Sequence, residues 1–192
     1  MAAEMTEYEK SLHELIRPLR TAKWSADYRW DSLEHSLVKL GADYGGLELC
    51  PDFQRGHVWS ESQQIHYIEN FLRGVVSRNI SVIQFNCPLW NDSPAGSDLP
   101  ASLQCVDGLQ RFTAITRFVK NEIKPFGLSA SDLAGTQFDP KRFHITVAVH
   151  DFTKRADLLA HYLSINVGGT PHSPEEIARV RALLEEAKAR TA

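Results

Sequence analysis

The sequence predicts an α/β (α+β) fold, a mixed sheet flanked by helices, and three observations support this class. Short β-branched runs alternate with amphipathic segments along the chain, instead of gathering in one half. The 192 residues are 43% hydrophobic and 23% charged, which is typical of globular proteins large enough to bury a core. Glycine, proline or capping residues stand between the segments and give the elements defined ends.

The N-terminal part of the chain predicts two helices and a short strand. Residues 4–20 place apolar side chains at loose helical spacing, which indicates an N-terminal helix against the domain or a partner. A second helix is expected to begin at Asp31 or Ser32. The run LELC is a short strand that ends at Pro51. We therefore divide the chain into a helical extension, residues 1–29, and a domain, residues 30–192.

The middle of the chain carries the best-marked helix. Ser60 and Gln63 have the spacing of a capping box, and the helix over 60–74 has one apolar face. Residues 80–86 are rich in β-branched side chains and predict a strand. The following run is rich in proline, glycine, serine and aspartate, so we expect an exposed loop there.

Two strands and three helices are predicted for the second half. The strands cover 102–106 and 142–150, where apolar and β-branched residues dominate. The helices cover 108–121, 154–166 and 173–190. The last helix opens with Ser-Pro-Glu-Glu, which places a capping residue before a proline at the first helical position.

The net charge and the cysteine content indicate which classes of protein fit this sequence. The net charge is −3 and the pI about 6.2, so any contact with nucleic acid must come from a local patch. The three cysteines show no C-x-x-C pair, and we expect reduced thiols. The N-terminus has no secretory signal pattern, and no apolar run reaches the ~18 residues of a membrane span. We expect a cytoplasmic protein without a membrane partner.

The stretch VDGLQR, residues 106–111, supports two interpretations. In the local one, Asp107 caps the next helix and Gln110 completes a capping box, which needs no ligand. In the functional one, Gly108 allows close approach to the backbone and Arg111 adds a cation near the free amides of the helix. A strand end, a glycine and a helix N-terminus together form a common phosphate site. There Asp107 would hold Mg²⁺ or orient a water molecule.

The loop over 50–60 carries a second set of polar side chains. Arg55 suits phosphate because its guanidinium donates two parallel hydrogen bonds, although it can equally pair with a surface carboxylate. His57 is either an acid/base group or an ordinary loop histidine. Phe53 and Trp59 are expected to be core anchors.

The run INVGGTPHSPEE, which starts at Ile165, is the third candidate. Gly168 and Gly169 precede a helix, where exposed amides can form an anion-binding nest, and Asn166 can bind a base or ribose. An ordinary turn between two helices is the alternative. No P-loop motif occurs, and the histidines lack metal-binding spacing.

In this order the motifs resemble the ParB/sulfiredoxin-like superfamily, in the branch marked by an Asp-Gly-Gln-Gln-Arg motif. They are PDFQRGHVW, QIHYIENFLRG, VDGLQRFTAI and INVGGTPHSPEEI. That branch supplies N-terminal domains of GmrSD-type modification-dependent restriction and phage-defence proteins. The resemblance covers roughly residues 30 to 180.

The resemblance matches individual positions of this chain to positions of the family motifs. Asp107, Gly108, Gln110 and Arg111 match the motif, and Leu109 stands where the family has its first glutamine. The upstream Phe-Gln-Arg pattern falls on Gln54 and Arg55, and the late glycine pair on Gly168 and Gly169. The resemblance implies nucleotide binding, often NTP hydrolysis with Mg²⁺, that controls action on DNA.

We therefore expect a nucleotide-binding phosphohydrolase or phosphotransferase domain that works on or beside DNA. Arg55, Arg111 and the amides near Gly108 would hold phosphates, Asp107 would bind the metal or position the attacking group, and Gln110 would orient water. The alternatives are a non-catalytic, nucleotide-gated DNA-binding module and a nicking nuclease that uses Asp107 and one metal. No His-Asn-His nuclease module follows in these residues, so autonomous cleavage is the less expected activity.

Overall fold

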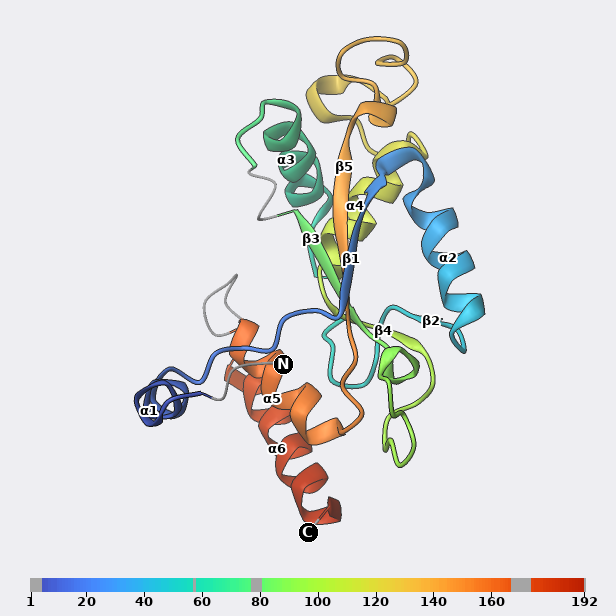
Figure 1. Cartoon of the computed structure of the whole chain (residues 1–192). Coiled ribbons are helices and arrows are strands. Elements are labelled where there is room, and N and C mark those ends of the chain that lie inside the picture. Colours follow the sequence, from blue (N-terminus) through green and yellow to red (C-terminus); the bar gives the residue numbers. More distant parts are fainter. Residues whose placement is uncertain (1–4, 57, 77–80, 167–173, 192) are drawn as a thin grey trace.

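A computed structural model of the chain has the expected mixed α+β class (Figure 1). The structure describes residues 5–56, 58–76, 81–166 and 174–191. The α-helices are α1 (Glu7–Ile16), α2 (Leu33–Asp43), α3 (Glu61–Leu72), α4 (Leu109–Val119), α5 (Arg155–Asn166) and α6 (Pro174–Thr191). The strands are β1 (Trp24–Arg29), β2 (Leu47–Glu48), β3 (Val82–Asn86), β4 (Leu103–Asp107) and β5 (His144–His150). Short 3-10 helices are η1 (Trp30–Ser32), η3 (Pro88–Trp90), η4 (Pro125–Gly127) and η5 (Pro140–Arg142).

The five strands form one sheet in the order β1-β5-β3-β4-β2. β1 runs antiparallel to β5, and β3 runs antiparallel to β4. The pairs β5–β3 and β4–β2 are parallel. The β3–β4 register shifts between Gln84 and Phe85, close to the point where β4 ends at Asp107. The carboxyl end of β4 and the start of α4 therefore lie beside the central strand β3.

Each face of the sheet has its own hydrophobic core. Leu103 and Cys105 of β4 lie in the larger core, which includes residues of α2, α3 and α4. Val106, the next residue, points to the other face and packs with Phe53, α5 and α6. This follows from the two-residue period of a strand. A fully buried side chain such as Ile115 or Phe53 stabilises the fold by about 1.5–3 kcal/mol.

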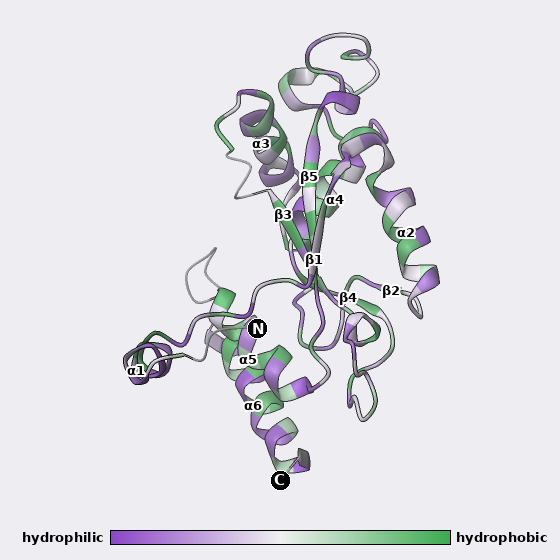
Figure 2. Ribbon diagram, in the orientation of Figure 1, coloured by the Kyte–Doolittle hydropathy of each residue, from purple (hydrophilic) through white to green (hydrophobic). Residues whose placement is uncertain are grey.

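The distribution of hydropathy agrees with this layering. Figure 2 shows hydrophobic residues concentrated on the central strands, with hydrophilic bands on the helices around them. Helix α3 begins at the predicted capping box, because the Ser60 side chain accepts the Gln63 amide and Gln63 Oε1 accepts the Ser60 amide. Helix α1 has no buried residue, and Leu15 is 80% exposed.

The N-terminal segment differs from the sequence expectation. In the expected extension 1–29, helix covers only Glu7–Ile16, while Trp24–Arg29 forms the edge strand β1. Its run WSADYR alternates large or apolar side chains with polar ones, which is the period of a half-buried strand, so the prediction missed a signal in the sequence. Pairing with β5 along six positions stabilises the strand. The start of α2 also differs, since Ser32 makes no side-chain cap bond.

The rest of the element prediction is confirmed with small shifts at the ends. The strand expected at 47–50 is limited to Leu47–Glu48. Helix α6 occupies most of the expected 173–190 range. In the parts of the chain that the structure describes, no helix combines the length and the apolar character that a bilayer crossing requires.

Candidate functional site

The loop before α3 and the turn between β4 and α4 come together around one cavity of about 140 Å³. The two segments are about 50 residues apart in sequence, and Ile165 and Asn166 of α5 line a third side. The cavity is lined by Gln54, Arg55, Trp59, Asp107, Gly108, Leu109, Gln110, Arg111, Ile165 and Asn166. Most of the predicted site residues that the structure describes therefore share one pocket.

The turn from β4 into α4 requires a glycine. Gly108 has a φ of +96°, a conformation that side chains with a Cβ rarely adopt. A Cβ at this position would lie 2.9 Å from the Cα of Ile83 in β3. The close approach that the sequence predicted therefore includes the neighbouring strand. Gly108 is buried and fixes the position of the α4 N-terminus against the sheet.

The expected Asp107/Gln110 capping box is wrong. The N-cap residue of α4 is Gly108, and no side chain caps this helix. Asp107 Oδ2 instead accepts a hydrogen bond from Nη2 of Arg111, one turn along the helix. The local interpretation fails because Asp107 is the last residue of β4, one position before the N-cap. The first amides of α4 have no intrahelical acceptor and no side-chain cap.

Arg111 has donors beyond those used by Asp107. Its side chain is 21% exposed, and the Asp107 side chain is 35% exposed. Within the described residues, the Nε atom of Arg111 is buried and has no hydrogen-bond partner. A buried guanidinium N–H without an acceptor is costly.

Gln110 joins the two segments of the site. Its Oε1 atom accepts hydrogen bonds from the backbone amides of Val58 and Trp59, each at 3.1 Å. Its Nε2 atom donates to the carbonyl oxygen of Gly56, also at 3.1 Å. Both ends of the amide thus bind the loop, which gives Gln110 a positioning role in this structure.

Arg55 and its neighbour Gln54 have different surroundings. The Gln54 side chain donates to the carbonyl of Val106 at 3.3 Å and accepts from the hydroxyl of Tyr162 at 3.1 Å. It connects β4 to α5. Arg55 lines the cavity and lies 3.7 Å from a carboxylate oxygen of Glu176 in α6. The carboxylate partner that the sequence allowed for Arg55 therefore exists, at the edge of the cavity.

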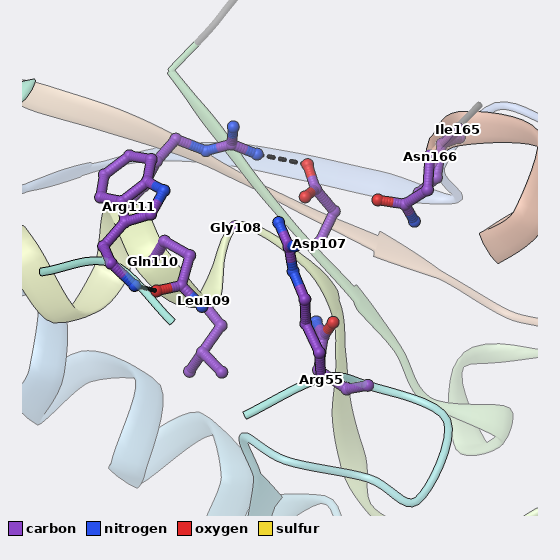
Figure 3. A pocket seen from close by; sticks show the side chains of 10 residues that line it. Arg55, Asp107, Gly108, Leu109, Gln110, Arg111, Ile165 and Asn166 are labelled. Carbon is purple, nitrogen blue, oxygen red and sulfur yellow. Dashed lines mark hydrogen bonds and ion pairs between the residues drawn. The ribbon is translucent and has the colours of Figure 1, made fainter. Parts of the chain in front are cut away.

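Figure 3 shows how the charged groups are arranged. The guanidinium of Arg111 reaches Asp107 from one side, and the Arg55 side chain extends toward the same carboxylate from the loop. The Asn166 amide points into this space from the end of α5, and its Nδ2 atom also donates to the carbonyl of Tyr162. His57, Gly168 and Gly169, which were predicted to contact phosphate, lie outside the described residues.

Comparison with known families agrees with the site motifs. The family described as "GmrSD restriction endonuclease, N-terminal domain" matches residues 39–145, more than half of the chain. The chain belongs to this family. No curated protein and no solved structure matches it.

The matched region of this GmrSD N-terminal domain contains most of the cavity. It includes the 51–59 loop, α3, β3, β4 and α4. Strand β1, helix α5 and helix α6 lie outside it. Ile165, Asn166 and Glu176 therefore complete the site from a region that the family match does not cover.

The cavity of this chain brings two arginines together with nearby carboxylates. Among the described residues, the charged groups that line it are Arg55, Arg111 and Asp107, and Glu176 lies 3.7 Å from Arg55. The N-terminus of α4 adds the positive end of the helix dipole. An anion entering here meets guanidinium donors and free amides at the same time.

Nearby thiol and phenol groups stay protonated at neutral pH. Burial and the charge of Asp107 raise the pKa of the Cys105 thiol to about 12. Burial also raises the pKa of Tyr67 and of Tyr162 to about 12. None of these groups is therefore an ionised nucleophile at pH 7. All three cysteines are free, as expected, although Cys50 is exposed.

The protein groups around the cavity offer little for a metal held by the chain alone. Among the residues that the structure describes, no group of three His, Cys, Asp or Glu side chains could hold a metal ion. Asp107 is the carboxylate that lines the cavity. Mg²⁺ commonly uses one or two carboxylates and takes its other ligands from phosphates and water. Asp107 fits that role only for an ion that arrives with a phosphate ligand.

Three residues contribute to the site in ways that the sequence did not indicate. Trp59 was expected to be a core anchor, yet it also lines the cavity. Glu176, in the Ser-Pro-Glu-Glu run at the start of the last helix, had no predicted role in the site, yet it lies 3.7 Å from Arg55. Tyr162 holds Gln54 through its hydroxyl. Each of these roles depends on contacts between distant segments, and the sequence carried no local signal for them.

Proposed function

We propose that this chain is a nucleotide-binding phosphohydrolase or phosphotransferase domain that works with DNA in restriction, anti-restriction or phage DNA metabolism. We also infer that it has the ParB/sulfiredoxin-like fold, in the Asp-Gly-Gln-Gln-Arg motif branch. One observation carries the proposal: Arg55 and Arg111, from segments far apart in sequence, line one cavity with Asp107 at the N-terminus of α4.

The arginines provide the phosphate-binding part of the site. A guanidinium donates parallel hydrogen bonds that match phosphate oxygens, and it remains charged at all relevant pH values. The partly exposed side chain of Arg111 supports this assignment, as does the absence of a side-chain cap at the start of α4. Phosphoryl transfer needs mostly this kind of placement and charge neutralisation.

Asp107 is the group that we assign to the reacting end of the ligand. A phosphate that takes the donors of Arg111 would release the Asp107 carboxylate from its ion pair. The carboxylate would then orient the attacking water or hydroxyl group, or bind Mg²⁺ together with phosphate oxygens. When bound, Mg²⁺ would neutralise the charge that develops on the phosphates. Gln110 supports the site by holding the loop at Gly56, Val58 and Trp59.

The link to DNA rests on the family. Its printed description is a restriction endonuclease N-terminal domain. With a net charge of −3, this chain has no overall attraction to DNA, so the contact would use a local patch. We propose that nucleotide binding or turnover in the cavity controls that contact.

The test combines binding and turnover measurements on the full chain. Calorimetry with ATP, GTP, CTP and UTP, with and without Mg²⁺, measures affinity, and phosphate release with and without duplex DNA measures turnover. Arg111→Ala and Arg55→Ala should each weaken binding by about 10- to 100-fold, the scale of lost charged hydrogen bonds. Asp107→Asn should abolish phosphate release. Arg29→Ala, which removes an arginine paired with Asp31 far from the cavity, is the matched control.

A second candidate is a nucleotide-gated DNA-binding module without turnover. It is favoured by Leu109, which is 5% exposed and packs in the larger core, where the family motif has a glutamine. Tight nucleotide binding without phosphate release would support this candidate. DNA nicking without nucleotide, abolished by Asp107→Asn, would instead identify a nuclease. Absence of any nucleotide binding would reject both nucleotide-based functions.

A further inference from the structure

We propose that the groove along α3 beside the cavity binds the base of the nucleotide, with Trp59 as the stacking platform. This inference rests on the proposed nucleotide-binding function and assigns the part of the ligand that the charged cavity does not explain. The groove is lined by Trp59, Ser62, Gln63, His66, Tyr67 and Asn70.

The sizes of the two sites suit different parts of one ligand. The charged cavity measures about 140 Å³, which is small beside the ~300–1,000 Å³ of typical small-molecule sites. The α3 groove measures about 510 Å³ and lies within that range. Trp59 lines both spaces, so they adjoin at this residue. The cavity has room for phosphate groups, and the groove has room for a sugar and base.

The groove has the chemistry that recognises a nucleobase. Trp59 and Tyr67 form an aromatic wall, with ring centroids 5.5 Å apart. Every base has a π-face, and stacking on such side chains is a common mode of binding. Gln63 and Asn70 carry amides, and the Asn70 amide lies 2.9 Å from Nε2 of the exposed His66. Amides and an imidazole can exchange hydrogen bonds with the edge of a base.

The hydrogen bond between Gln110 and Trp59 connects the charged cavity to the α3 groove. Gln110 holds the backbone amide of Trp59, and it belongs to the helix that presents Arg111. One side chain therefore connects the backbone of the stacking residue to the helix that carries the phosphate-binding guanidinium. A packing role alone would explain the contacts of Trp59 with the larger core, but it would not explain why the ring borders two adjoining spaces.

The experiment compares nucleoside triphosphates with inorganic tripolyphosphate as probes of the full chain. We expect the wild type to bind at least one NTP more tightly than tripolyphosphate. Trp59→Leu should lower the affinity for that NTP about tenfold or more, the range of base–aromatic stacking, while tripolyphosphate affinity stays unchanged. Arg111→Ala should weaken both ligands.

Two further variants test the groove without changing Trp59, in case Trp59→Leu does not fold. His66→Ala and Asn70→Ala change side chains on the rim of the groove, and they should reduce NTP affinity or alter the preference among the four bases. Trp90→Leu removes a tryptophan that packs with Trp24 and Tyr44 instead, and it is the control for loss of an indole. Thermal unfolding of each variant checks that it remains folded.

The outcomes separate this inference from the proposed function. If NTPs and tripolyphosphate bind equally well, and Trp59, His66 and Asn70 variants change neither, the base groove is wrong while the phosphate site stands. If neither ligand binds the wild type, the nucleotide-binding function fails and the groove assignment fails with it. Loss of NTP affinity alone in the Trp59 and rim variants supports the inference.

Discussion

The Oε1 atom of Gln110 accepts a hydrogen bond from the backbone amide of Trp59, with an N–O distance of 3.1 Å, although the two residues are 51 positions apart in sequence. The same side chain also binds Val58 and Gly56, so a single amide holds the loop before α3 onto the first turn of α4. This contact brings the arginine of the loop and the arginine of the helix to one cavity. The arrangement of the site therefore depends on the hydrogen bonds of Gln110, since no side chain caps α4.

Replacement of Gln110 by alanine should damage both stability and binding. Three hydrogen bonds are lost, and we expect a decrease of about 1–2 kcal/mol in the free energy of unfolding, because the bonds are partly solvent-exposed. Nucleotide affinity should also fall, since Arg55 and Trp59 lose their support. Urea unfolding and calorimetry measure the two effects. Gln137→Ala, at an exposed position, should change neither, and a Gln110→Ala protein with wild-type affinity would contradict the positioning role.

Gly108→Ala should be strongly destabilising. The new Cβ would adopt an unfavourable positive φ and approach Ile83 Cα at 2.9 Å, so we expect a loss of roughly 2–4 kcal/mol. Gly96→Ala has a similar φ of +78° but meets no atom within 4 Å, and it should cost about 1–2 kcal/mol from backbone strain alone. Urea unfolding of both variants measures the difference. Equal losses would show that contact with β3 does not constrain Gly108.

Glu176→Gln should strengthen phosphate binding. Glu176 lies 3.7 Å from Arg55 and opposes an incoming anion at the edge of the cavity. Loss of its charge should raise tripolyphosphate affinity about two- to fivefold, which corresponds to the energy of a partly exposed ion pair. Glu186→Gln removes a charge from an exposed position of the same helix and is the control. Unchanged or weaker binding in Glu176→Gln would mean that this carboxylate does not compete with the ligand.

Acid should destabilise the fold through a buried histidine pair on β5 and α5. The pKa of His150 is lowered from 6.5 to about 4, mainly by burial and also by the charges of His161 and Arg20, while the charge of Asp151 acts in the opposite direction. Burial also lowers the pKa of His161. Between pH 6.5 and about 4, the two histidines bind protons in the unfolded chain but remain neutral in the folded chain. The free energy of unfolding therefore decreases as pH falls.

The size of this effect is measurable by urea unfolding at several pH values. His150 should account for roughly 2 kcal/mol between pH 7 and pH 4. His150→Gln should flatten the pH dependence, whereas His35→Gln, at an exposed position, should leave it unchanged. Parallel curves for the wild type and His150→Gln would exclude the buried imidazole as the cause.

The sequence predicted much of the fold because local patterns encode it. The capping box at Ser60 and Gln63 marked the start of α3, and β-branched runs marked β3 and β5. The edge strand Trp24–Arg29 was missed although its side chains alternate between half-buried and exposed, because six residues with this pattern form a strand only when β5 provides the hydrogen-bonding partner.

The sequence by itself determined the order of the motifs and the candidate site residues within them, namely the arginines at 55 and 111 and the carboxylate at 107. Only the tertiary structure decided what these groups contact. Asp107 pairs with Arg111 instead of capping α4, Gln110 binds the loop, and Glu176 faces Arg55. The reason is physical: a helix or strand signal is complete within a few residues, whereas a cavity forms where segments from distant parts of the chain pack together.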